Sequence, residues 1–229
     1  EEENLKVLLP QIIEQVEKCG EEYEILVVDT EKPLDHTADV CAQFGARYVN
    51  QELPGFGGAF RTAIKYARKD KFLILDSDGS HPPKNIPDLY RMFVSGRYDV
   101  VIGSRYVKGG RTDDAKSSII MSHMLNFAFR VCLGISAKDI STDYRMYYTK
   151  QLKQVELTCV NYDVLQEVLL RLKLNKQDRR LRIGEVPIYF QKRLYGESKR
   201  QLVKFIISYL KTITRLTWMR IAHARRAGC

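Results

Sequence analysis

The segment that decides the fold is KFLILDSDGSHPPKNIPDLYRMF, residues 71–93, followed at 99–105 by DVVIGSR. Residues 71–75 form an apolar run of strand length, and residues 86–95 have apolar positions at helical spacing. Residues 99–102, DVVI, contain a second short apolar run and predict another strand. Strand, helix and strand in this order predict an α/β unit, in which ligand-binding side chains gather at the carboxyl ends of the strands.

The same alternation extends from these residues toward the N-terminus. The apolar spacing predicts a helix over 5–17, a strand over 23–28, a helix over 37–44, a strand over 47–50 and a helix over 59–68. The sequence therefore predicts an α/β fold with a mostly parallel sheet flanked by helices.

The second half of the chain predicts long helices over 117–133 and 163–174. Residues 182–190 predict a strand, and Pro187 within it indicates that this strand lies at the edge of the sheet. We expect one domain over 1–198 and a basic, amphipathic C-terminal extension over 199–229, with Trp218 near one end. Such a helix either lies in a membrane interface or packs on its own domain, and the sequence leaves both open.

Composition limits the class of protein. The chain has 229 residues with a net charge of +9, which favours anionic partners. We expect no nucleic-acid partner, because the basic residues lack the aromatic platforms or groove-reading helix of such proteins. Five scattered cysteines indicate neither a disulfide framework nor a zinc site. With no apolar run of the ~18–20 residues that a membrane span needs, and no visible signal peptide, we expect a cytoplasmic protein.

Two carboxylates follow the strand 71–75. Asp76 and Asp78 stand two residues apart, and paired carboxylates in this place can share a hard divalent cation such as Mg²⁺ or Mn²⁺. Such a cation would offset the charge of a diphosphate. The alternative is a plain turn, because Asp, Ser and Gly are all turn formers.

Four motifs, in this order along the chain, resemble those of a known family. They are LILDSDGSHPPKNIP at 73–87, DVVIGSRYVKGG at 99–110, DISTDYRMY at 139–147 and IGEVPIYFQKRLYGESK at 183–199. In these motifs the chain resembles the family 2 inverting glycosyltransferases, and among them the dolichyl- and polyprenyl-phosphate mannose synthases. The resemblance covers about residues 1 to 210 and implies the GT-A (Rossmann-like) fold.

The resemblance implies roles for particular residues. It places Asp29 at the donor nucleoside and Asp76 and Asp78 at the cation and diphosphate, with Ser80 as a further cation ligand. The implied catalytic residues are Asp78, Arg105 and Arg193. Ser198 and Lys199 are implied to close over the diphosphate. The residues implied near the sugar and the acceptor are Asp139, Ser141, Thr142, Arg145, Lys108 and Arg111.

Three departures from the family pattern stand out. The chain begins at EEENLK, where the family has a strand with a Pro-x-Tyr-Asn-Glu motif. Thr30 replaces the second Asp of the motif after the second strand, and Asp143 replaces a glycine. They motivate one alternative, a catalytically degenerate scaffold subunit with the same fold.

The implied activity is inverting transfer of a sugar, mannose from GDP-mannose, to the phosphate of a dolichyl or polyprenyl carrier. UDP-glucose or UDP-N-acetylglucosamine as donor is a second alternative. The acceptor phosphate is already largely ionised near pH 7, so no general base is needed. A lipid acceptor implies peripheral association with the cytoplasmic face of a membrane, through the membrane surface or a membrane-spanning partner subunit.

Overall fold

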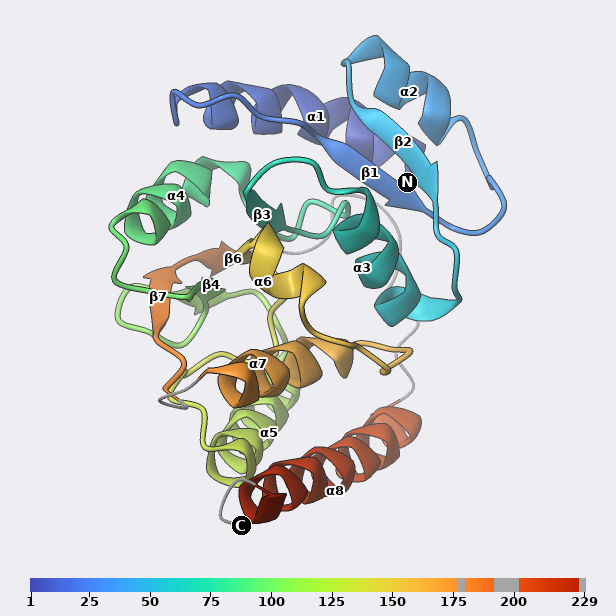
Figure 1. Ribbon diagram of the computed structural model, residues 1–229. Helices are drawn as coiled ribbons and strands as arrows, with labels where there is room; N and C mark the ends of the chain where they lie inside the picture. Colours follow the sequence, from blue (N-terminus) through green and yellow to red (C-terminus); the bar gives the residue numbers. More distant parts are fainter. Residues whose placement is uncertain (177–179, 192–201, 227–229) are drawn as a thin grey trace.

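A four-stranded sheet lies at the centre of the computed structural model, which describes residues 1–176, 180–191 and 202–226 (Figure 1). Its strands, in spatial order, are β3 (Lys71–Ile74), β6 (Arg145–Tyr148), β4 (Val100–Ser104) and β7 (Ile183–Pro187). Strands β3, β4 and β7 run in one direction, and β6 runs against them. The predicted α/β fold is confirmed, and β7 lies at the edge as Pro187 indicated.

Strand β6 is the strand of the central sheet that the sequence pattern did not predict. It inserts antiparallel between β3 and β4, so Tyr147 is paired with Phe72 on one side and with Val100 on the other. Its four residues follow a polar segment and have no β-branched run. Long-range pairing rather than local propensity makes them a strand.

A parallel pair of strands and three helices form the N-terminal part of the molecule. The elements are α1 (Glu2–Glu17), β1 (Leu26–Asp29), α2 (Thr37–Gln43), β2 (Arg47–Asn50) and α3 (Gly55–Tyr66). All five match the predicted order. Helix α3 begins earlier than predicted, at Gly55 rather than at residue 59, and the N–H of Gly57 donates to the carbonyl of Val160 at 2.8 Å.

The central sheet is buried on both faces. Val100 and Ile102 of β4 pack into one core with α3, α5 (Lys116–Leu133) and α7 (Val164–Asn175). Val101 between them packs into a second core with α1 and α4 (Ile86–Val94). Alternation of side chains along a strand thus explains why residues 100–102, VVI, are all apolar.

Short elements connect these layers. They are a 3₁₀ turn (Pro83–Asn85), β5 (Arg111–Thr112), α6 (Thr149–Lys153) and β8 (Tyr189–Phe190). Strands β5 and β8 pair in parallel. The predicted strand 182–190 is therefore divided between β7 and β8, which belong to different sheets.

Helix α8 (Leu202–Arg226) lies against α5 and α7 (Figure 1). Tyr209 and Leu216 are buried in the same core as α5 and α7, whereas Trp218 is 72% exposed. The packing favours the alternative in which this helix lies on its own domain. No helix among the described residues is both long and apolar enough to cross a membrane.

Candidate functional site

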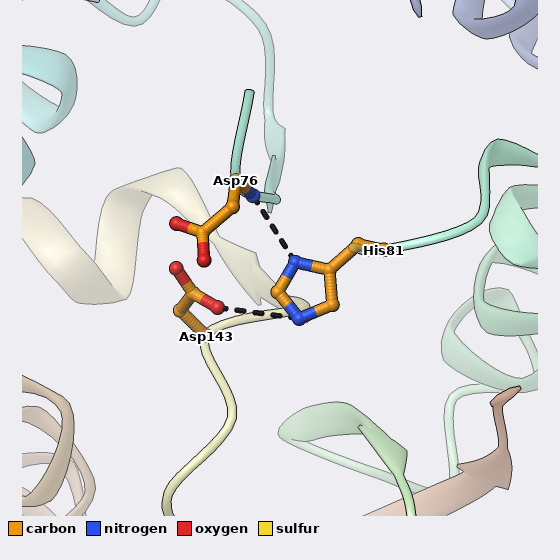
Figure 2. Close-up of side chains that lie close together, drawn as sticks. All are labelled: Asp76, His81 and Asp143. Atoms are coloured by element: carbon orange, nitrogen blue, oxygen red, sulfur yellow. Dashed lines mark hydrogen bonds and ion pairs between the residues drawn. The ribbon is translucent and has the colours of Figure 1, made fainter. Parts of the chain in front are cut away.

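An acidic cluster lies where β3 ends. Ligand atoms of Asp76, His81 and Asp143 all lie within 4.8 Å of one another. Asp76 and His81 belong to the turn after β3, and Asp143 comes from the loop before β6. Figure 2 shows the carboxyl groups of Asp76 and Asp143 side by side, with the His81 ring across from both.

Hydrogen bonds fix the His81 ring. Its Nδ1 accepts the backbone N–H of Asp76 at 3.1 Å, and its Nε2 lies 3.4 Å from Oδ1 of Asp143 and 3.3 Å from Oγ1 of Thr142. Burial lowers the pKa of His81, so the ring is neutral near pH 7. Because Nδ1 is an acceptor, the proton of the neutral ring is assigned to Nε2.

Asp76 and Asp143 both have raised pKa values, so ionising either carboxyl group costs more free energy than in water. Burial and the neighbouring charge of Asp143 raise the pKa of Asp76 well above its usual range, and burial also raises the pKa of Asp143. The Oδ2 atom of Asp143 is buried, and no N–H or hydroxyl group among the described residues donates to it, so its neighbour is the carboxyl group of Asp76. Close carboxylates suit a divalent cation, which takes oxygen ligands and would relieve the repulsion.

The sequence predicted a different cation set, namely Asp76, Asp78 and Ser80. The structure brings Asp76 together with His81 and Asp143 instead. Asp78 and Ser80 are both buried nearby, and Oδ1 of Asp78 accepts the N–H of Ser80 at 2.9 Å. The negative charge of Asp78 also raises the pKa of Asp76. Ligation by Asp78 and Ser80 stays a prediction, while Asp143, noted only as a departure from the family pattern, is the residue that sequence reasoning missed.

Arg105, at the end of β4, pairs with buried Asp139. Its Nε and one terminal nitrogen donate to the two carboxylate oxygens at 2.8 and 2.9 Å. The same nitrogen donates to Oγ of Ser141 at 2.6 Å, and Asp114 lies 3.4 Å from the other nitrogen. Burial opposes ionisation of Asp139, but the hydrogen bonds from Arg105 hold its pKa below the usual range. Direct contact of Arg105 with a phosphate stays a prediction.

Arg145 does not lie at a ligand-facing surface. Its side chain is fully buried and donates to the carbonyls of Thr142, Ile140 and Leu165 at 2.6, 2.8 and 2.7 Å. These bonds satisfy three backbone acceptors and shape the loop 139–145. The structure therefore gives Arg145 a role in holding this loop, in place of the sugar or acceptor contact that the resemblance implied.

The basic loop after β4 borders a pocket of about 480 Å³. Two arginines, Arg105 and Arg111, line it, together with the ring side chains of Tyr106, His123 and Tyr189. Lys108 is exposed on the same connection between β4 and β5. Cationic and hydrogen-bonding groups in one hollow suit an anionic ligand.

The ring of Phe190 links the pocket to the acidic cluster. Its centroid lies 5.3 Å from that of His81 and 5.4 Å from Cζ of Arg105. The acidic cluster and the basic pocket are therefore neighbours across one aromatic ring. Phe190 carried no signal in the sequence, because only the pairing of β8 with β5 brings it here.

The remaining predicted residues lie apart or outside the described part of the chain. Asp29 ends β1, where its Oδ2 accepts the hydroxyl of Tyr48 at 2.9 Å. Its contact with a nucleoside stays a prediction. Arg193, Ser198 and Lys199 lie outside the described residues.

Comparisons with known proteins identify the family of the chain. The sequence model of glycosyl transferase family 2 matches residues 1–155. The chain is 31% identical to the dolichol-phosphate mannosyltransferase of Pyrococcus furiosus over 229 aligned residues, covering 94% of this chain but only 60% of that protein. It is 30% identical to the undecaprenyl-phosphate mannosyltransferase of Micrococcus luteus, covering 83% of this chain and 81% of that protein.

A solved structure shares the fold. The glucosyl-3-phosphoglycerate synthase of Mycobacterium tuberculosis, in complex with Mn²⁺, UDP and phosphoglyceric acid, superposes with a TM-score of 0.70 at 19% identity. The match covers 95% of this chain and 75% of that one. At this identity it shows the GT-A fold alone. With two thirds of its length matched by the family model, the chain belongs to glycosyl transferase family 2.

Proposed function

We propose that this chain is an inverting glycosyltransferase that moves mannose from GDP-mannose to the phosphate of a dolichyl or polyprenyl carrier. The observation that carries the proposal is the acidic cluster next to the Arg105–Arg111 pocket, joined across Phe190. The names of the two mannosyltransferase relatives support mannose and a polyprenyl phosphate.

The two halves of the site suit two phosphorylated substrates. A divalent cation held at the acidic cluster would offset the charge that develops on the leaving diphosphate. The pocket would hold the acceptor phosphate through Arg111, with Arg105 kept in place by Asp139. An acceptor phosphate needs no base near neutral pH, so the chain has only to position its two substrates and supply positive charge.

An apolar stripe on α5 supports a lipid acceptor. Four of its residues are each between 61% and 68% exposed, and their spacing of four, three and four puts them on one face of the helix: Ile120, Met124, Phe127 and Val131. The same helix lines the pocket through Ile119 and His123. A lipid head group in the pocket would therefore have apolar surface beside it, and a membrane surface is the proposed location of the enzyme.

A transfer assay tests the function. Purified protein would receive labelled GDP-mannose, a short polyprenyl phosphate and Mn²⁺ or Mg²⁺, with UDP-glucose and UDP-N-acetylglucosamine as parallel donors. We expect mannosyl transfer that chelation of the cation abolishes. Transfer from a UDP-sugar alone would replace the donor in the proposal. Folded protein that binds none of the donors in a calorimetric titration would favour the degenerate scaffold.

A further inference from the structure

The two carboxylate oxygens of Asp143 have different surroundings: one contacts His81, and the other has no N–H or hydroxyl partner among the described residues. The residue is only 4% exposed, and its Oδ1 lies 3.4 Å from Nε2 of His81. Its Oδ2 is buried, and no N–H or hydroxyl group among the described residues donates to it, so its neighbour is the carboxyl group of Asp76. Two buried carboxyl groups side by side cost free energy unless a proton or a cation lies between them.

The carboxyl group of Asp143 faces that of Asp76. Asp76 and Asp143 stand side by side in Figure 2, and their ligand atoms fall within 4.8 Å together with that of His81. Asp76 follows β3 and Asp143 precedes β6 at the same end of their antiparallel pairing, where Ile74 is paired with Arg145, so the fold holds both carboxylates at one point. A divalent cation between them would gain two oxygen ligands from two different segments.

His81 is poorly placed to be a ligand itself. A neutral imidazole offers a single unprotonated nitrogen, and Nδ1 of His81 already accepts the backbone N–H of Asp76. Its Nε2–H faces Oδ1 of Asp143 and Oγ1 of Thr142. In this arrangement His81 orients the carboxylate of Asp143 and does not itself bind the cation.

We propose that Asp143 is a ligand of the divalent cation through Oδ2, and that His81 is a positioning residue that holds Asp143 without ligating. The inference deepens the proposed function and rests on it for the presence of a cation. It follows that the cation ties the loop 139–145 to the turn after β3. The same loop carries Asp139, which holds Arg105, so the cation site and the basic pocket share one loop.

The test measures binding of Mn²⁺ alone by the electron paramagnetic resonance signal of the free ion. Wild type is expected to bind Mn²⁺, and Asp143→Asn to lose about 10- to 100-fold in affinity, similar to Asp76→Asn. Asp88→Asn, which removes an exposed carboxylate on α4, is the matched control and is expected to bind as wild type does. No binding by wild type, or equal binding by Asp143→Asn, overturns the proposal.

A thermal melt separates loss of a ligand from misfolding. Without cation, Asp143→Asn is expected to melt no lower than wild type, because the substitution keeps the shape and removes repulsion from Asp76. With Mn²⁺, the melting temperature of wild type is expected to rise and that of the variant to stay unchanged. Equal rises in both proteins would contradict Asp143 as a ligand.

Spin-echo modulation spectra of bound Mn²⁺ test His81. A directly bound imidazole gives a strong ¹⁴N modulation, and wild type is expected to lack it. His81→Gln is expected to retain the environment of the ion while weakening its binding. A ¹⁴N modulation present in wild type and absent in His81→Gln would make His81 a ligand and refute its positioning role.

The outcome of these tests is independent of the transfer assay. If Asp143→Asn loses Mn²⁺ but wild type transfers no sugar, the cation site stands and the proposed function fails. If wild type transfers mannose and Asp143→Asn binds Mn²⁺ normally, the function stands and the role of Asp143 fails.

Discussion

The guanidinium of Arg105 donates two hydrogen bonds to the carboxylate of Asp139, with nitrogen–oxygen distances of 2.8 and 2.9 Å. Asp139 is fully buried and the Arg105 side chain is 10% exposed. Two hydrogen bonds between buried charged groups fix the orientation of the guanidinium as well as its position. Arg105 is thereby set at the wall of the pocket before any ligand arrives.

The first prediction concerns this pair. Asp139→Asn removes the carboxylate that pairs at two points with the largely buried Arg105 charge and leaves it with Asp114, 3.4 Å away. The free energy of unfolding is therefore expected to fall by about 3–5 kcal/mol. The measurement is urea unfolding. Asp113→Asn, which removes an exposed carboxylate that accepts from Tyr189, is expected to cost about 1 kcal/mol or less. Equal losses in the two variants would contradict a special role for the buried pair.

The second prediction separates holding the loop from binding substrate at Arg145. Arg145→Met leaves the carbonyl of Thr142 without its donor, whereas the carbonyl of Ile140 keeps the side-chain amide of Gln166 at 2.8 Å. A buried acceptor without a donor costs about 1–3 kcal/mol, so a loss of at least about 1 kcal/mol is expected. Arg91→Met, at a side chain that is 78% exposed, is expected to change stability by about 0.5 kcal/mol or less. Unchanged stability with abolished transfer would instead restore the substrate contact implied by the family resemblance.

The third prediction concerns pH and Asp99. Burial opposes ionisation of Asp99, but hydrogen bonds from Arg182 and Lys176 hold its pKa below the usual value, at distances of 3.0 and 2.6 Å. Because the pKa is lower in the folded than in the unfolded chain, this group stabilises the fold above the unfolded pKa of about 4. The stabilisation is lost as the pH falls through the folded pKa.

Unfolding in urea across a pH series checks this sign. The difference in stability between wild type and Asp99→Asn is expected to be constant above about pH 5 and to shrink below about pH 4. A difference that grows as the pH falls would show that the folded pKa is raised rather than lowered.

The fourth prediction concerns the apolar stripe of α5. Phe127→Ser is expected to weaken binding to vesicles containing anionic lipid by about tenfold or more, because burial of a Phe side chain is worth about 1.5–3 kcal/mol. Its stability in solution is expected to change little, because Phe127 is mostly exposed. Co-sedimentation with vesicles is the measurement, and Val94→Ser, at an exposed apolar side chain on α4, is the control. Unchanged vesicle binding would assign the stripe to a protein partner.

Local sequence was sufficient for most of the elements. The apolar runs at 71–75 and 99–102 become β3 and β4, and the helical spacings at 5–17, 117–133 and 163–174 become α1, α5 and α7. These patterns are reliable because a strand buried on both faces must be apolar throughout, and a helix on a sheet must be apolar on one side. Because the apolar run of β3 could be recognised, so could the two carboxylates that directly follow it, Asp76 and Asp78.

Partners distant in sequence were decided by tertiary structure alone. Strand β6 exists because β3 and β4 leave a place between them, and its insertion brings Asp143 to Asp76 and His81. The pairing of β8 with β5 brings Phe190 between His81 and Arg105. The sequence by itself determined the layers and the strand end that carries the acidic site. Which residues complete that site depends on contacts between segments more than 60 residues apart, such as His81 and Thr142, and no local pattern encodes such contacts.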